Sequence, residues 1–234
     1  MKDIIKRIAK LFFGIFLYSV GIVMTVNANL GLAPWDVFHQ GLANKAGITM
    51  GQASIIVGMA FVVLDSFLGE RLGWGTIANM LFIGGFFDLL MFYQIIPVFQ
   101  PLVLRFIMML SGMFVIGIAS YFYISSALGT GPRDGLMVAL TKRTDRSVRF
   151  IRNCIELCAL VIGFFLGGSV GMGTVVMAVT AGYFIQLAFR LFRYDVTGTK
   201  HRFIDEDIKY LKDRFFNTGK MAEPEQQKNL SEGE

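Results

Sequence analysis

The sequence contains one pattern twice, separated by 98 positions with no gap between the two registers. The clearest match sets Leu30-Gly31-Leu32-Ala33-Pro34-Trp35-Asp36 against Leu128-Gly129-Thr130-Gly131-Pro132-Arg133-Asp134. The same shift carries Leu68-Gly69 onto Leu166-Gly167, and Gly73, Gly75 and Thr76 onto Gly171, Gly173 and Thr174. A single register through so much of the chain indicates an internal duplication. Each copy is mostly apolar, and a duplicated membrane unit is typical of small-solute transporters.

The distribution of charge points to a polytopic membrane protein. Of the residues, 54% are hydrophobic and only 17% are charged, whereas soluble domains carry about a quarter charged residues. The charges gather in the first ten residues, in residues 133–152 and after residue 190, and long uncharged runs separate them. The basic clusters stand at the ends of apolar runs, where the positive-inside rule places Lys and Arg. The net charge of +5 therefore does not predict a nucleic-acid partner.

Six apolar segments are each near the ~17–25 residues that a helix needs to cross the hydrocarbon. They run from Leu11 to Ala28, Gly51 to Leu68, Trp74 to Ile96, Leu102 to Ser126, Phe150 to Leu166 and Met172 to Phe189. Basic and non-basic connectors alternate, which predicts that both termini are cytoplasmic. Because each copy crosses three times, the second copy enters from the opposite side. We therefore predict an all-α membrane protein of six transmembrane helices, arranged as two inverted three-helix repeats.

The chain divides into three parts on this interpretation. Residues 1–98 form the first three-helix repeat and residues 99–192 the second. Residues 193–234 form a cytoplasmic amphipathic helix and a disordered tail. Ile204, Ile208, Leu211 and Phe215 fall at helical spacing, which predicts a helix lying on the membrane surface or on the bundle. The polar composition further on predicts disorder.

The repeated motif predicts a helix stop, a tight turn and a helix restart. Its glycine permits the turn, its proline suits the first turn of a new helix, and its aspartate lies where the helix dipole stabilises a negative charge. Apolar residues follow both motifs, so the restarted helices are candidates for re-entrant elements, which are tolerated where they line a cavity. Either the turns line the solute pathway or they are capped surface loops. The candidate pathway residues are Gly31, Pro34, Trp35 and Asp36 in the first copy and Gly129, Pro132 and Asp134 in the second.

These residues also carry a family resemblance. The string Asn29-Leu30-Gly31-Leu32-Ala33-Pro34-Trp35-Asp36-Val37, followed by Gly47-Ile48-Thr49-Met50-Gly51, resembles the YczE/YitT-type family of bacterial integral membrane proteins. The resemblance covers about residues 11–190, and the second copy departs from it with Arg133 in place of Trp35. It implies a multi-pass protein of the bacterial cytoplasmic (inner) membrane. It brings no settled substrate and no established catalytic residues.

Ionisable residues inside the apolar segments are costly and default to paired or functional roles. Asp88 lies well inside the third segment, and its equivalent in the second copy is Gln186. Asp88 either pairs with Arg105 on the next segment or takes part in solute handling or coupling, and both Asp88 and Gln186 are candidate pathway residues. Asp65 and Glu156 are expected to extend their carboxylates to the membrane interface.

No catalytic motif, metal-ligand cluster or nucleotide-binding loop occurs in the sequence, so we expect no enzyme, no cofactor and no metal. The expected function is transport of an unidentified small solute by alternating access at the repeat interface. The alternative is a non-transporting accessory membrane protein that acts through a partner. Lys142, Arg143 and Arg146 are expected to bind anionic membrane lipids at the cytoplasmic surface. A homodimer is one assembly consistent with the small size of the unit.

Overall fold

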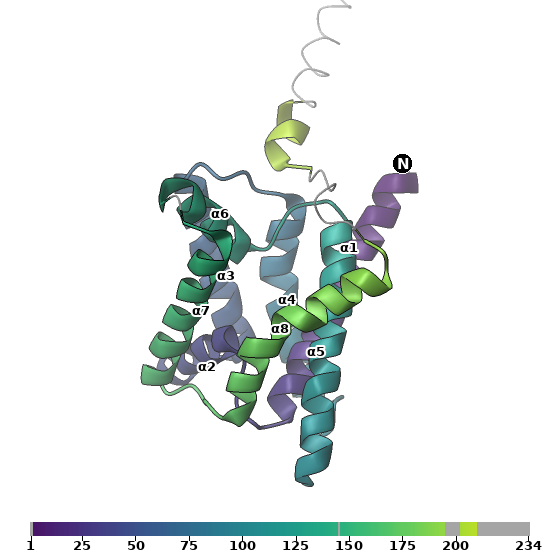
Figure 1. The fold of residues 1–234 in the computed structure, drawn as a ribbon. Coiled ribbons are helices and arrows are strands. Elements are labelled where there is room, and N and C mark those ends of the chain that lie inside the picture. The colour runs from purple at the N-terminus through teal and green to yellow at the C-terminus, as the bar shows by residue number, and fades with distance from the viewer. Residues whose placement is uncertain (1, 145, 195–201, 210–234) are drawn as a thin grey trace, which may run out of the picture.

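The computed structural model describes residues 2–144, 146–194 and 202–209, and every regular element in these ranges is helical. The helices are α1 (Lys2–Asn27), α2 (Pro34–Ala46), α3 (Met50–Phe67), α4 (Trp74–Phe92), α5 (Leu102–Ser125), α6 (Pro132–Thr144), α7 (Val148–Phe165) and α8 (Met172–Leu191). A short helix at residues 204–209 follows. The long helices alternate in direction along the bundle (Figure 1).

Within the described residues, five helices are long and apolar enough to cross a membrane: α1, α3, α4, α5 and α8. The remaining predicted segment, Phe150 to Leu166, also forms a helix, α7, with bounds within two residues of those expected. However, α7 carries Arg149, Arg152 and Glu156 in 18 residues, so composition alone does not mark it as a span. The helices α2 and α6 have 13 residues each, which is shorter than a span requires.

The helix boundaries repeat with the sequence. Shifting α2 by 98 positions reproduces the bounds of α6, and the same shift carries α3 onto α7. The starts of α4 and α8 and the ends of α1 and α5 are related in the same way. Each copy therefore consists of a long helix, a short helix and two further long helices.

The long helices α1 and α5 pack against each other with their backbones in close contact. A Cβ added at Gly14 would lie 2.7 Å from the Tyr123 nitrogen, and one added at Gly21 would lie 2.8 Å from the Gly112 carbonyl oxygen. From Gly14 to Gly21 on α1, the contacted residue on α5 changes from Tyr123 to Gly112. Residue numbers thus rise on one helix while they fall on the other, so the two helices are antiparallel. Gly14 and Gly112 are equivalent positions of the two copies, so the crossing contacts itself symmetrically. Glycine permits such close helix approach within a membrane.

The connectors of the two copies bind across to each other. The Gly173 N–H donates a hydrogen bond of 2.7 Å to the Leu30 carbonyl, and the Gly75 N–H donates one of 2.7 Å to the Leu128 carbonyl. These two bonds are related by the repeat shift. The start of α8 therefore binds the turn before α2, and the start of α4 binds the turn before α6. The main apolar cluster also contains residues from both copies.

The short helices also pack on the opposite copy. Helix α2 lies against α7, where a Cβ on Gly163 would be 2.5 Å from the backbone of Phe38, and α6 lies against α3, where a Cβ on Gly135 would be 2.1 Å from the Asp65 carboxylate. Figure 1 shows α6 toward the end of the molecule where α1 begins, and α2 toward the other end. The two motifs thus approach the middle of the bundle from opposite ends.

The segment 202–209 docks on the connector between α3 and α4. Arg71 forms ion pairs of 2.7 Å with Asp205 and 2.8 Å with Glu206, and the Trp74 indole donates a hydrogen bond to Asp207. The Arg71 hydrogen bond lowers the pKa of Asp205 below its ordinary value. Of the predicted amphipathic helix, Ile204 lies at the start of the short helix and Ile208 within it. Its remaining apolar positions, Leu211 and Phe215, lie outside the described residues, as does the predicted disordered tail.

Candidate functional site

The repeated motif forms the stop, turn and restart that its residues predict. Gly31 and Gly129 have φ of 106° and 133°, values that residues with a side chain rarely adopt. Pro34 and Pro132 begin α2 and α6, where the missing N–H costs nothing. The turn at Gly31 also has no room for a side chain, because a Cβ there would lie 2.5 Å from the Gly171 nitrogen.

The two motif aspartates stand in the first turns of the short helices but make different contacts. Asp134 accepts a hydrogen bond of 3.1 Å from the Gly131 N–H and so closes its own turn. Asp36 is buried, with 8% of its surface exposed, and its Oδ1 lies 3.9 Å from Nδ1 of His39. Asp134 therefore caps a turn, whereas Asp36 faces an ionisable neighbour in the protein interior.

One pair of equivalent positions that differ in chemistry, Trp35 and Arg133, meets in the structure. The Arg133 guanidinium carbon lies 4.6 Å from the centre of the Trp35 ring, and these two residues are repeat equivalents. Phe61 of α3 packs edge-to-face with Trp35, with the two ring centres 5.4 Å apart. An arginine stacked on an aromatic face gains a cation–π interaction while its N–H edge stays available.

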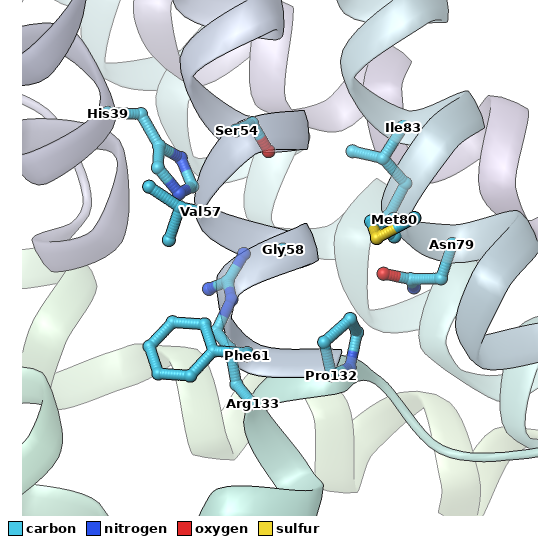
Figure 2. A pocket seen from close by; sticks show the side chains of 10 residues that line it. All are labelled: His39, Ser54, Val57, Gly58, Phe61, Asn79, Met80, Ile83, Pro132 and Arg133. Carbon is cyan, nitrogen blue, oxygen red and sulfur yellow. The ribbon is translucent and has the colours of Figure 1, made fainter. Parts of the chain in front are cut away.

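A cavity of about 280 Å³ lies beside this pair. Its polar lining comes from five helices: Tyr18 of α1, Asn79 of α4, Ser120 and Tyr123 of α5, Arg133 and Asp134 of α6, and Arg152 and Glu156 of α7. Two smaller spaces, of about 20 and 10 Å³, adjoin Arg133 on its other side and are lined by His39 and Ser54, with Asp36 at the smaller one. In Figure 2 the Arg133 side chain points from α6 toward His39, with Asn79 on the opposite wall.

Charged residues of α7 face this cavity. The Arg152 and Glu156 side chains, one helical turn apart, form an ion pair of 3.1 Å. Both line the cavity, and pairing within a polar cavity is how charges are accommodated at membrane depth. The Arg152 and Glu156 side chains are 53% and 29% exposed, so this pair borders the cavity where it opens to the surface, and Arg149 is exposed as well.

Some of the candidate pathway residues come together here and others do not. Trp35, Pro132 and Asp134 line the large cavity, and Asp36 lines the smallest space. Gly31, Pro34 and Gly129 shape the turns that place them. Gln186 is exposed and lines a separate shallow groove with Phe189 and Arg190.

Asp88 has a structural environment of its own. It accepts hydrogen bonds from the Thr49 hydroxyl (2.5 Å) and from the Gly51 N–H (2.9 Å), at the start of α3. Arg105, the expected partner, instead donates to the backbone carbonyls of Ala28 and Asn29. Asp88 thus holds the start of α3, and a solute-handling role for it stays a prediction.

The expectation that Asp65 reaches the membrane interface is wrong. Its side chain is 1% exposed, and Oδ1 has no hydrogen-bond partner among the described residues. The physical reason is the packing of α6: Gly135, which has no side chain, lets the helix backbone cover the carboxylate. Glu156 differs from Asp65, because its side chain stays 29% exposed and pairs with Arg152 one helical turn away.

The basic residues at the end of α6 lie at the surface with contacts to protein. Lys142 forms an ion pair of 2.8 Å with Glu70, and Arg143 donates to the Leu68 carbonyl. Arg146 lies 5.9 Å over the Phe150 ring. Lys142 remains 64% exposed, and lipid binding by these residues stays a prediction.

Residues that sequence reasoning missed include Tyr18 and Tyr123. Neither carries a motif, and their participation depends on how α1 and α5 cross. For Trp35 and Arg133 a signal was available, because the 98-residue register identifies them as equivalent positions of the two copies.

Comparison with known proteins agrees with the resemblance. The chain is 33% identical over 191 residues to the uncharacterized membrane protein YczE of Bacillus subtilis, covering 80% of this chain and 87% of that protein. It is 34% identical over 181 residues to an uncharacterized protein of Haemophilus influenzae, covering 77% and 82% of the two chains. It is also 25% identical over 178 residues to the uncharacterized protein YyaS of B. subtilis, covering 74% and 88%.

No solved structure gives a significant match. The family profile described as "Family of unknown function (DUF6198)" matches residues 5–190, which is most of the chain and nearly all of both copies. The chain therefore belongs to the DUF6198 family and is a YczE-like multi-pass integral membrane protein.

Proposed function

We propose that the protein transports a small solute across the bacterial cytoplasmic membrane, through the cavity at which its two copies meet. The single observation that carries this proposal is the cavity of about 280 Å³ beside Trp35 and Arg133. Ligand sites in transporters built from repeats lie at the repeat interface, beside interrupted helices. In this protein the turns before α2 and α6 provide the interruptions.

The proposal takes α7 as the sixth span and the two copies as inverted repeats. Inversion is supported by the antiparallel crossing of α1 and α5 and by the reciprocal bonds at Leu30 and Leu128. Spanning by α7 is supported by its repeat equivalence to α3 and by the pairing of Arg152 with Glu156, which compensates two of its charges at the cavity. With the positive-inside rule, α6 then lies on the cytoplasmic side and α2 on the outer side.

The cavity differs in volume from the space at the equivalent positions of the other copy, and this difference supports alternating access. The large cavity is lined on α7 by Arg152 and Glu156. The equivalent positions on α3, Ser54 and Gly58, line a space of only about 20 Å³. One half of the interface is thus open while its counterpart is closed, which is the asymmetry expected of a transporter halted in one of two states.

The test begins with a thermal-shift screen of the purified full chain against a metabolite library, since a ligand of the native state raises its stability. Each hit is then offered as a labelled solute to proteoliposomes. A cavity-filling variant, Ile155→Trp, is expected to lose both stabilisation and uptake, because Ile155 lines the cavity. The matched control is Val179→Trp on α8, where the native side chain is 65% exposed, and it should retain both.

Two results would contradict transport. One is the absence of uptake above empty liposomes for every solute that stabilises the protein. The other is equal uptake by wild type and Ile155→Trp. An accessory role would instead be indicated if removal of residues 202–234 abolished the cellular function while ligand stabilisation of the remaining bundle persisted.

A further inference from the structure

The cavity presents hydrogen-bond donors that no described protein group uses. Among residues 2–144, 146–194 and 202–209, the Arg133 guanidinium has no hydrogen-bond or ion-pair partner. It lies over the face of the Trp35 ring. Stacking occupies the face of the guanidinium plane and leaves its five N–H groups pointing outward. An arginine held in this way is arranged to receive a planar anionic group.

A second donor stands in the same cavity and is buried. Tyr123 is 5% exposed, and its hydroxyl has no hydrogen-bond partner in the part of the chain that the structure describes. It lines the cavity together with Arg133. A buried hydroxyl without a partner is unfavourable and uncommon in folded proteins, so an acceptor supplied by a ligand would satisfy it.

The other charged groups limit the charge of the ligand. Arg152 and Glu156 neutralise each other, and Asp134 accepts from its own turn. Asp36 lies in the adjoining small space, near His39. The two arginines that line the cavity are balanced by Asp134 and Glu156, and Asp36 adds a negative charge nearby. This arrangement opposes an anion of two or more charges more strongly than one of a single charge. The volume of about 280 Å³ suits a solute of modest size.

We propose that this site binds a small organic solute through a single carboxylate group, held by the Arg133 guanidinium with the Tyr123 hydroxyl as a second donor. Arginine and carboxylate match in a bidentate geometry, and Trp35 fixes the plane of the guanidinium. This inference rests on the proposed function, because it names the substrate class of the same cavity.

The test measures binding to the purified full chain in detergent, by thermal shift and by calorimetry. The probes are butyrate, benzoate, leucine and phenylalanine, each compared with its primary amide, together with inorganic phosphate and sulfate. We expect at least one carboxylate to bind about tenfold or more tightly than its amide, because a charge-assisted bond to Arg133 is lost in the amide. Leucine and phenylalanine, set against butyrate and benzoate, distinguish an amino acid from a plain carboxylate.

Variants then locate the binding. Arg133→Gln should weaken the best carboxylate about tenfold or more, while Arg149→Gln, with the same charge change at an exposed position of α7, should bind as wild type does. Tyr123→Phe should weaken the ligand too, yet leave the melting temperature of the ligand-free protein unchanged or higher, since its hydroxyl has no partner to lose. The Tyr123 variant keeps the test decisive if Arg133→Gln does not fold.

The inference is overturned if no carboxylate binds, if amides or phosphate bind as tightly, or if Arg133→Gln and Tyr123→Phe both bind normally. Its failure is separable from that of transport. Carboxylate binding with no uptake into proteoliposomes supports the site and contradicts the transporter, whereas uptake of an uncharged solute with no carboxylate binding does the reverse.

Discussion

Replacing Gly163 by alanine should push α2 away from α7. An alanine Cβ at this position would lie 2.5 Å from the Cα and nitrogen of Phe38 and 2.6 Å from the carbonyl carbon of Val37, where ordinary contacts are 3.4–4 Å. These are backbone atoms that cannot rotate aside, so the helices must separate by about 1 Å. Overpacking of this kind costs ~1–3 kcal/mol, against a gain of up to ~1 kcal/mol from the better helix propensity of alanine.

The matched control is Gly182→Ala in α8, where an added Cβ meets nothing within 4 Å. It should leave the free energy of unfolding unchanged or raise it by up to ~1 kcal/mol. Because both changes gain the same propensity, the difference between them isolates the packing cost, expected at ~1–3 kcal/mol. The free energies come from detergent-induced unfolding followed by tryptophan fluorescence. In a Trp74→Phe background the remaining signal reports Trp35 on α2 directly.

The reasoning fails if the two alanine variants differ by less than ~0.5 kcal/mol, the usual size of neutral surface effects. The same conclusion would follow if Gly163→Ala were less stable but left the Trp35 emission and ligand binding unchanged, because the displaced helix carries the aromatic partner of Arg133.

Four further predictions concern the membrane orientation, the motif and the charged surfaces. A cysteine at Ser169 should react with a membrane-impermeant reagent from outside intact cells; reaction only after the membrane is breached would contradict the proposed orientation. Asp36→Asn and Asp134→Asn keep a capping side chain but remove its charge, and we expect at least one to lose uptake at normal stability; full uptake by both, alone and combined, would make the motif architectural. Replacing Lys142, Arg143 and Arg146 by Gln should reduce the anionic lipid retained on purification, at ~1 kcal/mol for each near-surface charge, and unchanged lipid content would mean that they act as topology signals. Because Arg71 lowers the pKa of Asp205, docking of residues 202–209 should persist at neutral pH and weaken as the pH falls below about 4; hydrogen exchange that does not change with acid or with Arg71→Ala would exclude this ion pair as the anchor.

The helices themselves follow from local sequence signals. The observed bounds of α3, α5 and α7 lie within two residues of those predicted, because apolar runs ended by glycine and proline are properties of short stretches of chain. The restart of α2 and α6 at Pro34 and Pro132 follows for the same reason. The register of the duplication then transfers each boundary from one copy to the other.

The partners of individual charges do not follow from local signals. Asp88 and Asp65 both read as carboxylates inside apolar segments, yet one holds the start of α3 and the other is covered by α6. Which of these occurs depends on the packing of helices distant in the sequence, and on Gly135 in particular. The pairing of Trp35 with Arg133 is intermediate, because the repeat register identifies equivalent residues but not whether they meet.

The two copies share one arrangement of helices but differ in the side chains where their short helices, α2 and α6, pack. In the contact of α2 with α7, the backbone at Val37 meets Gly163, whereas at the equivalent positions of α6 and α3, Gly135 meets Asp65. The glycine lies on the long helix α7 in the first contact and on the short helix α6 in the second. Close packing is therefore kept in both, and only the contact of α6 with α3 contains a carboxylate. A change of state that separated α6 from α3 would give Asp65 access to water, and the α2–α7 contact would expose no equivalent carboxylate. The pair Asp65→Gly with Gly135→Val would copy the first interface into the second. Stability retained in the double variant but not in Gly135→Val alone would show that the fit is interchangeable, and any loss of uptake at that retained stability would then belong to the carboxylate.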